Sequence, residues 1–359
     1  MKLIIGGDVS IKEDCEQLFK DENVEELFRD ITQVFKSADR TLINLECAVT
    51  EKDTPIKKIG PNLKAPLNTI ETLKKAGVTD VGLSNNHIFD FGKAGLKDTV
   101  ELLEKFGINY TGIGENDIDA RKNLIISDGK IKIAVIAVCE HEYSYALPDR
   151  VGTRAYDPYD TNDDIALAKQ SADYVIVTYH GGKEECRYPS ERLVKACRSM
   201  IKHGADVVLC QHSHCIGCYE QFNGGHILYG QGNFHFICKR YENKEDKGYM
   251  WNTGLLVALD IDKNGLKIDF LPTIVDGNGV RLCQGEEKEK ILSELKERSL
   301  SLKDGSYKER FREFCFTKPG YLFIPEEKRE KFAHYLDCEA HTDVWREVYT
   351  TYNRTNEKD

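Results

Sequence analysis

Two histidines separated by a single residue follow a short apolar run in the second half of the chain. The run Val207-Val208-Leu209 predicts a buried strand, and His212-Ser213-His214 comes directly after its polar end. Side chains two residues apart in an extended segment point to the same side. If the extended geometry continues, both imidazoles can reach one metal ion or a close pair of ions, because imidazole nitrogen is a common metal ligand.

Four other apolar runs also end in residues that bind metals or transfer protons. In chain order these residues are Asp8, Glu46, Asn86 with His87, and His180. Asp90 follows His87 at a spacing that lets its carboxylate hold the imidazole in one tautomer. Carboxylate, amide and imidazole ligands together suit two divalent ions such as Mn²⁺, Fe²⁺ or Zn²⁺ better than Ca²⁺. Such a pair of ions can activate a water and neutralise a phosphoryl oxygen, which is the equipment of a hydrolase.

Each of these residues also has a purely structural explanation. Asp8 and His87 fit helix or turn caps, and single histidines are more often packing residues than ligands. The charged turn after His180, which includes Glu184 and Arg187, would lie near a bound anion, although a solvated charge cluster is the simpler explanation. A further alternative places a structural zinc ion on a set of sulfur and nitrogen donors, namely Cys210, His212, Cys215 and Cys218.

Strands and helices alternate along most of the chain, in the pattern of an α/β protein. Strands are predicted at residues 3–5, 41–46, 78–84, 108–111, 124–126, 131–138, 174–180, 206–210, 226–229, 255–260 and 266–274. Helices are predicted at residues 24–37, 67–76, 93–106, 165–172 and 190–203, and in the charged tail from residue 286, at 307–314 and at 326–336. Residues 51–65 and 140–160 are predicted to form loops that cover the site.

Composition fits a soluble globular protein. Of the 359 residues, 40% are hydrophobic and 31% are charged, and the formal net charge is −10. This charge argues against nucleic-acid binding, which requires clustered Lys and Arg. No apolar run approaches the roughly 18 residues of a membrane span, and residues 1–8 are too short for a secretory signal. Together with 12 cysteines that lack a compact disulfide framework, this predicts a cytoplasmic protein with free thiols.

The strand-end motifs, taken in order, resemble those of a known family. They are Gly7-Asp8, Asn44-Leu45-Glu46, Asn85-Asn86-His87 with Asp90 and Gly92, His180-Gly181-Gly182, His212 with His214, and Gly232-Asn233-Phe234. Their order is similar to that of the CapA-type capsule-synthesis family, also called the poly-γ-glutamate synthesis family. That family resembles the calcineurin-like metallophosphoesterases, so the resemblance implies an α/β protein with a β-sandwich of two sheets flanked by helices. It covers about residues 1 to 275.

The resemblance also implies a role for each matching residue. Asp8, Glu46 and His214 would bind one metal ion, and Asn86, His180 and His212 would bind the other together with Glu46, which would bridge the two. His87 would donate a proton to the leaving group and would be oriented by Asp90. Asn233 and Glu184 would contact the substrate or surround the ligands. The charged turn after His180, independently of the resemblance, adds Arg187 to this set.

The chain departs from the related families at four of these positions. Ser10 stands where metallophosphoesterases place a histidine, and Glu46 stands where they place an aspartate. Ser213 replaces a proline common in the family, and Gly181 replaces a tryptophan. Many family members also carry an N-terminal membrane anchor, which is not expected here.

The sequence therefore predicts a metal-dependent hydrolase, phosphoesterase-like, that acts on an anionic small-molecule or polymer substrate of capsule or poly-γ-glutamate metabolism. The alternative is a metal-binding accessory protein without turnover. We expect a metallophosphoesterase-like domain at residues 1–280 and a helical C-terminal extension, packed on that domain, at residues 281–359.

Overall fold

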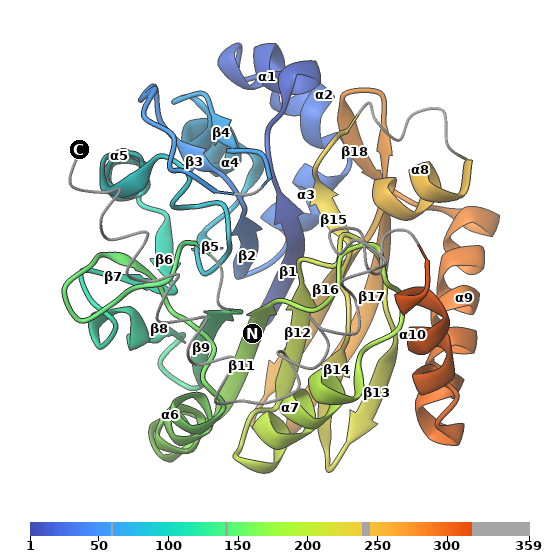
Figure 1. The fold of residues 1–359 in the computed structure, drawn as a ribbon. Coiled ribbons are helices and arrows are strands. Elements are labelled where there is room, and N and C mark those ends of the chain that lie inside the picture. Colours follow the sequence, from blue (N-terminus) through green and yellow to red (C-terminus); the bar gives the residue numbers. More distant parts are fainter. Residues whose placement is uncertain (59, 141–142, 239–244, 318–359) are drawn as a thin grey trace, which may run out of the picture. The chain divides into compact units, whose positions relative to one another are not determined.

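The computed structural model describes residues 1–58, 60–140, 143–238 and 245–317 (Figure 1). The chain divides into two compact units. One combines Met1–Ile56 with Asn62–Phe311, and the other combines Lys57–Pro61 with Arg312–Asp359. The first unit holds both large sheets and every candidate site residue.

The larger sheet has eight strands in the order β18-β17-β16-β1-β2-β5-β6, with β15 paired to β1. Its strands are β1 (Lys2–Val9), β2 (Arg40–Leu45), β5 (Asp80–Gly82), β6 (Asn109–Thr111), β15 (Asn233–His235), β16 (Thr253–Asp262), β17 (Gly265–Asp276) and β18 (Gly279–Leu282). The strands β1, β2, β5 and β6 are parallel, whereas β16, β17 and β18 are antiparallel. The predicted hairpin of residues 255–260 and 266–274 is confirmed by β16 and β17.

The second sheet has six strands in the order β13-β14-β12-β11-β9-β8. Its strands are β8 (Leu124–Ser127), β9 (Lys132–Cys139), β11 (Tyr174–His180), β12 (Val207–Gln211), β13 (Tyr219–Phe222) and β14 (Gly225–Leu228). Two small sheets pair β3 (Ala48–Val49) with β4 (Lys64–Ala65), and β7 (Ile113–Gly114) with β10 (Gly152–Thr153). The strands β9, β11, β12 and β14 are parallel, so their carboxyl ends share one edge of the sheet.

Helices cover the outer face of each sheet (Figure 1). The first five are α1 (Glu13–Lys20), α2 (Val24–Phe28), α3 (Ile31–Lys36), α4 (Thr69–Ala76) and α5 (Gly92–Phe106), and they pack on the larger sheet. The second sheet is covered by α6 (Pro158–Ser171) and α7 (Glu191–Lys202). The remaining helices are a 3₁₀ turn at Asp119–Arg121, α8 (Glu245–Asn252), α9 (Gly285–Asp304) and α10 (Tyr307–Cys315).

Strand alternation explains why the described residues form three apolar cores. Along β1, Leu3 and Ile5 face the second sheet, while Ile4 faces the helices on the other side. Along β11, Ile176 faces the larger sheet, and Val175 and Val177 face α6 and α7. Central strands buried on both faces are therefore continuously hydrophobic. The predicted fold class, an α/β sandwich of two sheets flanked by helices, is confirmed.

Three local predictions differ from the structure. The helix predicted over residues 24–37 is split into α2 and α3, because Arg29 has φ 40° and its guanidinium is turned to bind Asp276. Residues 140–160 are less irregular than predicted, since they contain β10 and the start of α6. The strand before His212 ends at Gln211, so the extended geometry does not continue through the two histidines.

The charged tail is partly described. Helices begin at Gly285 and Tyr307 as predicted, while the helix predicted at residues 326–336 lies outside the described residues. Ile291 and Leu295 of α9 belong to the core between the sheets, and residues up to Phe311 belong to the first compact unit. The domain boundary at residue 280 stays a prediction. Within the described part of the chain, no helix is both long enough and apolar enough to cross a membrane.

Candidate metal centre

The carboxyl ends of the central parallel strands of both sheets bring the candidate ligands together. Asp8 lies near the end of β1, in register with Asn44 of β2, and Glu46 follows β2 directly. In the second sheet, His180 is the last residue of β11 and is in register with Gln211 of β12. Crevices at the carboxyl ends of parallel strands are the usual place for a ligand in α/β folds.

One group of ligand atoms comes from both sheets. A carboxylate oxygen of Asp8, a carboxylate oxygen of Glu46 and a ring nitrogen of His180 all lie within 4.8 Å of one another. His180 Nε2 is 3.4 Å from Glu46 Oε1, and His180 Nδ1 is 3.8 Å from Asp8 Oδ1. All three side chains are buried, so the group satisfies the first requirement of a metal site, which is convergent donors shielded from bulk water.

A second group shares Glu46 with the first. It consists of Glu46, His212 and His214, whose ligand atoms also lie within 4.8 Å of one another. Both histidines are in the left-handed region, with φ of 74° and 51°, and this turn rather than an extended strand directs their rings. The ring centroids of His180 and His212 are 4.8 Å apart, so the two groups are in contact. Glu46 therefore lies where the resemblance places a bridging ligand.

The two groups divide the histidines differently from the partition that the resemblance implies. His180 shares a group with Asp8, and His214 shares one with His212. His214 is nevertheless close to Asp8 as well, at 3.5 Å between Nδ1 and Oδ2. Which ligands belong to which ion stays a prediction, while the common position of Glu46 is the same in both schemes.

The Glu46 carboxylate is buried without the hydrogen bonds that a buried charge requires. Neither oxygen has a hydrogen-bond partner among the described residues, although the residue is fully inaccessible to solvent. Burial, and then the charge of Asp8, raise the pKa of Glu46 to about 7. A divalent cation would supply the compensation that the protein does not. The donor set therefore fits a bound divalent cation, while the number of ions stays a prediction.

His180 is held as a neutral imidazole between two amides. Its Nδ1 accepts from Asn44 Nδ2 at 3.1 Å, and its Nε2 lies 3.0 Å from Asn86 Oδ1, which can only accept. Burial, followed by the charge of His212, lowers the pKa of His180 well below its usual value. A neutral imidazole is the form that binds a metal ion. Asn86 is thus brought to the ligand groups, as predicted from the sequence.

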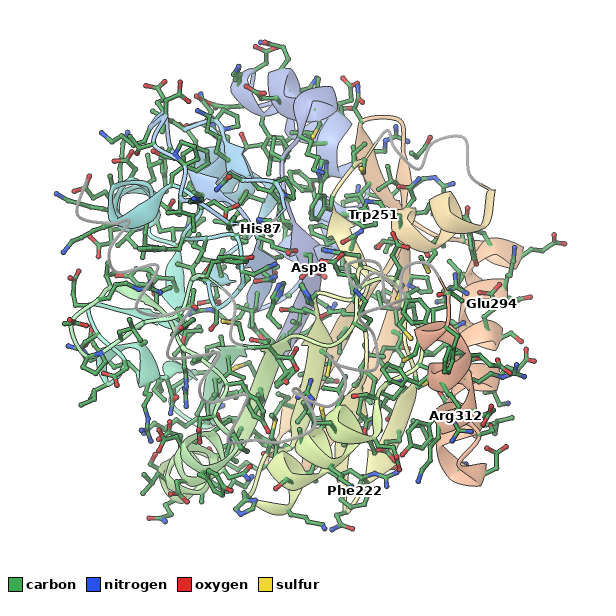
Figure 2. The ribbon with its side chains drawn as sticks, in the orientation of Figure 1. Asp8, His87, Phe222, Trp251, Glu294 and Arg312 are labelled. Atoms are coloured by element: carbon green, nitrogen blue, oxygen red, sulfur yellow. The ribbon has the colours of Figure 1, made fainter. Side chains whose placement is uncertain are left out.

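His87 and Asp90 form the local pair that their spacing predicts. His87 Nδ1 lies 2.7 Å from Asp90 Oδ2, and the same oxygen accepts the backbone N–H of Leu63 at 2.6 Å. The side chain of Asp90 is fully buried, whereas 11% of the His87 side chain is exposed. Figure 2 shows His87 and Asp8 near the ends of β1 and β2. Asp90 therefore fixes the orientation of the His87 ring, which follows the candidate ligand Asn86 directly in the chain.

The three residues assigned to the surroundings differ in position. Asn233 contacts a ligand, since its Oδ1 lies 2.9 Å from His214 Nδ1 while its Nδ2 donates to the Trp251 carbonyl. Glu184 is half exposed, with a carboxylate oxygen 4.0 Å from His212 Nε2. Arg187 is directed to α9 instead, where it lies 3.7 Å from Glu294. The roles of these residues stay predictions.

Sequence reasoning gave no role to Asn44 or Trp251. Asn44 Nδ2 donates to Asp8 Oδ1 at 2.7 Å as well as to His180, so one amide orients ligands from both sheets. The signal was available, because a polar residue two positions before Glu46 in a buried strand faces the same side. The ring of Trp251 packs against His214 in a tilted arrangement with ring centroids 4.6 Å apart, and no sequence spacing connects these two residues.

The alternative zinc site on cysteines is wrong. Cys210 Sγ contacts Cys197 Sγ at 3.5 Å, and Cys218 Sγ is directed to the carbonyl of Arg298. Among the described residues, neither group of three or more convergent donors includes a cysteine. Residues 215–218 instead form part of the packing against α9.

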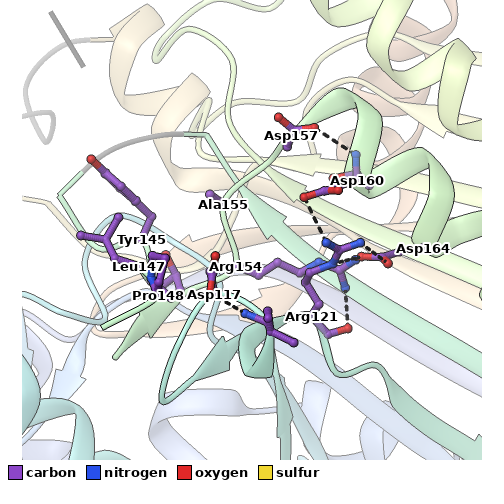
Figure 3. Close-up of a pocket in the computed structure, with 14 residues that line it drawn as sticks. Asp117, Arg121, Tyr145, Leu147, Pro148, Arg154, Ala155, Asp157, Asp160 and Asp164 are labelled. Carbon is purple, nitrogen blue, oxygen red and sulfur yellow. Dashed lines mark hydrogen bonds and ion pairs between the residues drawn. The ribbon is translucent and has the colours of Figure 1, made fainter. Parts of the chain in front are cut away.

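A separate pocket of about 230 Å³ lies between the segment 143–155 and the first turns of α6. Figure 3 shows Arg121 and Arg154 converging on Asp164 in its wall. Asp164 accepts two hydrogen bonds from Arg121, at 2.7 and 2.9 Å, and one from Arg154 at 2.5 Å. Asp164 is therefore paired with cations within the protein. Its contact with Arg154 links the predicted covering loop, residues 140–160, to α6.

Comparison with known proteins assigns the chain to a family. The family model described as bacterial capsule synthesis protein PGA_cap matches residues 2–237, about two thirds of the chain. The chain belongs to this family. The matched segment contains every residue of the two ligand groups, together with His87 and Asp90.

The names of curated relatives also refer to capsule, PGA or polyglutamine synthesis. The capsule biosynthesis protein CapA of Bacillus anthracis is 26% identical over 301 residues, which are 80% of this chain and 71% of that protein. The PGA biosynthesis protein CapA of Bacillus subtilis is 28% identical over 266 residues, covering 72% of this chain and 67% of the relative. A probable polyglutamine synthesis accessory protein of Mycobacterium tuberculosis is 29% identical over 210 residues, about half of each chain.

Solved structures are more distant. A hypothetical protein from Thermus thermophilus is 15% identical, with a TM-score of 0.45 over 76% of this chain and 99% of that one. Vps29 of Chaetomium thermophilum is 9% identical, with a TM-score of 0.28 over 79% of this chain and 95% of that one.

Proposed function

We propose that the chain is a metal-dependent, phosphoesterase-like hydrolase of capsule or poly-γ-glutamate metabolism, acting on an anionic substrate. One observation carries the proposal. Glu46 is shared by two groups of buried donors, and neither of its oxygens has a hydrogen-bond partner within the described residues. A buried carboxylate in this position is costly unless a cation or a proton compensates its charge.

The ligands would be Asp8, Glu46, Asn86, His180, His212 and His214, and the ions would be Mn²⁺, Fe²⁺ or Zn²⁺. When bound, the two ions would supply an activated water and neutralise negative charge on the substrate. Asn44 keeps Asp8 and His180 oriented through its single amide. Asn233 holds the ring of His214 through the contact between its Oδ1 and His214 Nδ1.

His87 would donate the proton to the leaving oxygen. Its Nδ1 is bound to Asp90, which leaves Nε2 as the atom that faces the reaction. Asp90 is itself fixed by the N–H of Leu63, so the pair is oriented before substrate binds. His87 needs no metal contact in this role.

The roles of His87 and Asp90 are tested with His87→Asn and Asp90→Asn. The assay is the release of p-nitrophenol from phosphate mono- and diesters with added Mn²⁺. We expect kcat to fall by roughly 100-fold or more for His87→Asn, while the metal content stays at the wild-type value. His203→Asn changes an exposed histidine at the end of α7 and serves as the matched control. An unchanged kcat in His87→Asn would exclude the acid role.

The shared position of Glu46 is tested by elemental analysis of purified variants. Glu46→Ala should lose both ions, because the side chain belongs to both groups. Asn86→Ala should lose one, because its amide oxygen contacts His180, which belongs to a single group. Retention of two ions by Glu46→Ala would contradict the bridging role.

A metal-binding accessory protein without turnover is the second candidate. The relative in Mycobacterium tuberculosis is named as an accessory protein, which supports this alternative. Intact binding of two ions with no turnover of any ester, for any divalent ion, would favour it over the hydrolase. A cytoplasmic location remains our prediction for either function.

A further inference from the structure

The helix α9 carries three charged residues on one face, outside the segment that matches the family. Lys290, Glu294 and Arg298 are spaced by four residues, so their side chains line up along the helix. They run from the surface inward: Lys290 is exposed, Glu294 is partly buried, and Arg298 is 8% exposed. Figure 2 shows Glu294 on α9.

Two other elements complete this surface. Arg187, from the turn after β11, lies 3.7 Å from Glu294. The ring of Tyr249, in α8, lies under Lys290 at 4.6 Å and is 6.0 Å from the guanidinium of Arg187. The hydroxyl of Tyr249 donates to Glu294 over 3.5 Å. We call Arg187, Lys290 and Arg298, together with Tyr249 and Glu294, the cationic strip.

The strip has more positive charge than its own contacts neutralise. Among the described residues, Glu294 has the only carboxylate within 4 Å of any of the three cations, and it lies 3.7 Å from Arg187. In the described part of the chain, no carboxylate lies within 4 Å of Arg298, whose Nε donates to the carbonyl of Gly217. Burial, followed by the charge of Arg187, lowers the pKa of Arg298. A purely structural role for these residues would leave this repulsion uncompensated.

The strip is joined to the ligand groups through two short connections. The turn that ends at Arg187 begins at His180, carries Glu184 beside His212, and is fixed by the hydrogen bond from Glu185 N to Ser213 O at 2.9 Å. Arg187 comes three positions after Glu184, which is at most about 11 Å of chain. In α8, Tyr249 comes two positions before Trp251, whose ring packs against His214 in a tilted arrangement.

We propose that the cationic strip is an anion-binding subsite, which holds a negatively charged group of an extended substrate while another part of that substrate lies at the metal centre. The inference rests on the proposed function for the identity of that neighbouring site. The ligand chemistry is a flexible chain with repeated anionic oxygens, carboxylate or phosphate, because guanidinium groups pair with both.

The test measures binding by the metal-free full-length chain, so it does not depend on turnover. The probes are a fluorescently labelled γ-linked oligoglutamate and a short linear polyphosphate, and the readout is fluorescence anisotropy in the presence of a chelator. We expect Lys290→Glu to weaken binding roughly tenfold and Lys290→Gln about threefold. Lys290 is exposed, so neither change should alter folding, which circular dichroism checks.

Lys296→Glu is the matched control, because it makes the same charge change at an exposed position of α9 away from the strip. It should leave binding at the wild-type value. Equal losses in Lys290→Glu and Lys296→Glu, or no loss in Lys290→Glu with either probe, would overturn the subsite. A loss confined to one probe identifies that anion as the ligand chemistry. If probe binding depends on Lys290 but the metal-loaded protein hydrolyses no ester, the hydrolase proposal is contradicted and the anion-binding subsite is still supported.

Discussion

Two clusters of buried charges lie in the same compact unit and differ in how their charges are satisfied. In the pocket of Figure 3, Asp164 is bound by Arg121 and Arg154, and Arg154 also donates to Asn123 and to a backbone carbonyl. At the strand ends, Glu46 is buried more completely than Asp164, yet its oxygens have no hydrogen bond within the described residues. The first cluster is complete within the chain. The second leaves a buried carboxylate without a hydrogen-bond partner among the described residues, as the proposed metal centre requires.

The comparison predicts opposite effects on stability. Arg154→Met should lower the free energy of unfolding by about 3 kcal/mol, because it leaves Asp164, whose side chain is 13% exposed, with one cation fewer. In metal-free protein, Glu46→Gln should have no cost or should stabilise, because it removes an uncompensated buried charge. Urea unfolding of both variants measures this. A loss for Glu46→Gln as large as that for Arg154→Met would break the comparison.

The pH dependence of metal-free protein should show the same contrast. Burial raises the pKa of Glu46 to about 7 in the folded protein, above its ordinary value in the unfolded chain. The folded state therefore binds the proton more tightly, and the stability from this group, fully present below about pH 4.5, is lost as pH rises towards 7. Relative to Glu46→Gln, wild-type protein should lose up to about 3 kcal/mol across this window. Parallel stability curves for the two proteins would contradict the unpaired carboxylate.

Added metal should reverse the cost of Glu46. With Mn²⁺ at about 100 times its dissociation constant, the free energy of unfolding should rise by about 2.7 kcal/mol for each ion bound. Arg154→Met should gain as much as wild-type protein, whereas Glu46→Gln should gain much less. Thermal unfolding with and without a chelator gives the result, and equal gains in all three proteins would place the ions elsewhere.

The smallest expected effect concerns an exposed ion pair at the edge of the Arg121, Arg154 and Asp164 cluster. Arg121 also lies 3.0 Å from Asp160, whose side chain is 61% exposed. Asp160→Asn should cost less than about 1 kcal/mol, because exposed ion pairs gain little over hydration. A cost similar to that of Arg154→Met would show that burial does not set the value of these pairs, and chemical denaturation would detect it.

Much of the fold could be predicted from local patterns. Central strands such as β11 are continuous apolar runs bounded by polar residues, and α7 has its capping Ser190 and an apolar face. The prediction failed where a long-range contact determines the backbone. The predicted helix over residues 24–37 is interrupted at Arg29, whose guanidinium binds Asp276, nearly 250 residues away in sequence. No local sequence pattern predicts such a contact.

The candidate site, like the fold, could be predicted where it depends on local sequence patterns. The positions of Asp8, Glu46 and His180 at strand ends followed from the sequence, and the structure brings them together. The reasoning given for His212 and His214 was wrong, because their convergence depends on positive φ angles rather than on strand alternation. Asn44 was overlooked because its importance lies in touching one ligand from each sheet.

By itself, the sequence determined the kinds of donor and the strand end at which each one stands, because apolar periodicity and polar termination are local properties of the chain. Only the tertiary structure decided that Glu46 is shared between two groups, that Asn44 links the sheets, and that α9 brings Lys290 and Arg298 towards Arg187. The physical reason is that these contacts join segments separated by tens to hundreds of residues. Their geometry follows from how two sheets and a late helix pack, and no spacing along the chain encodes it.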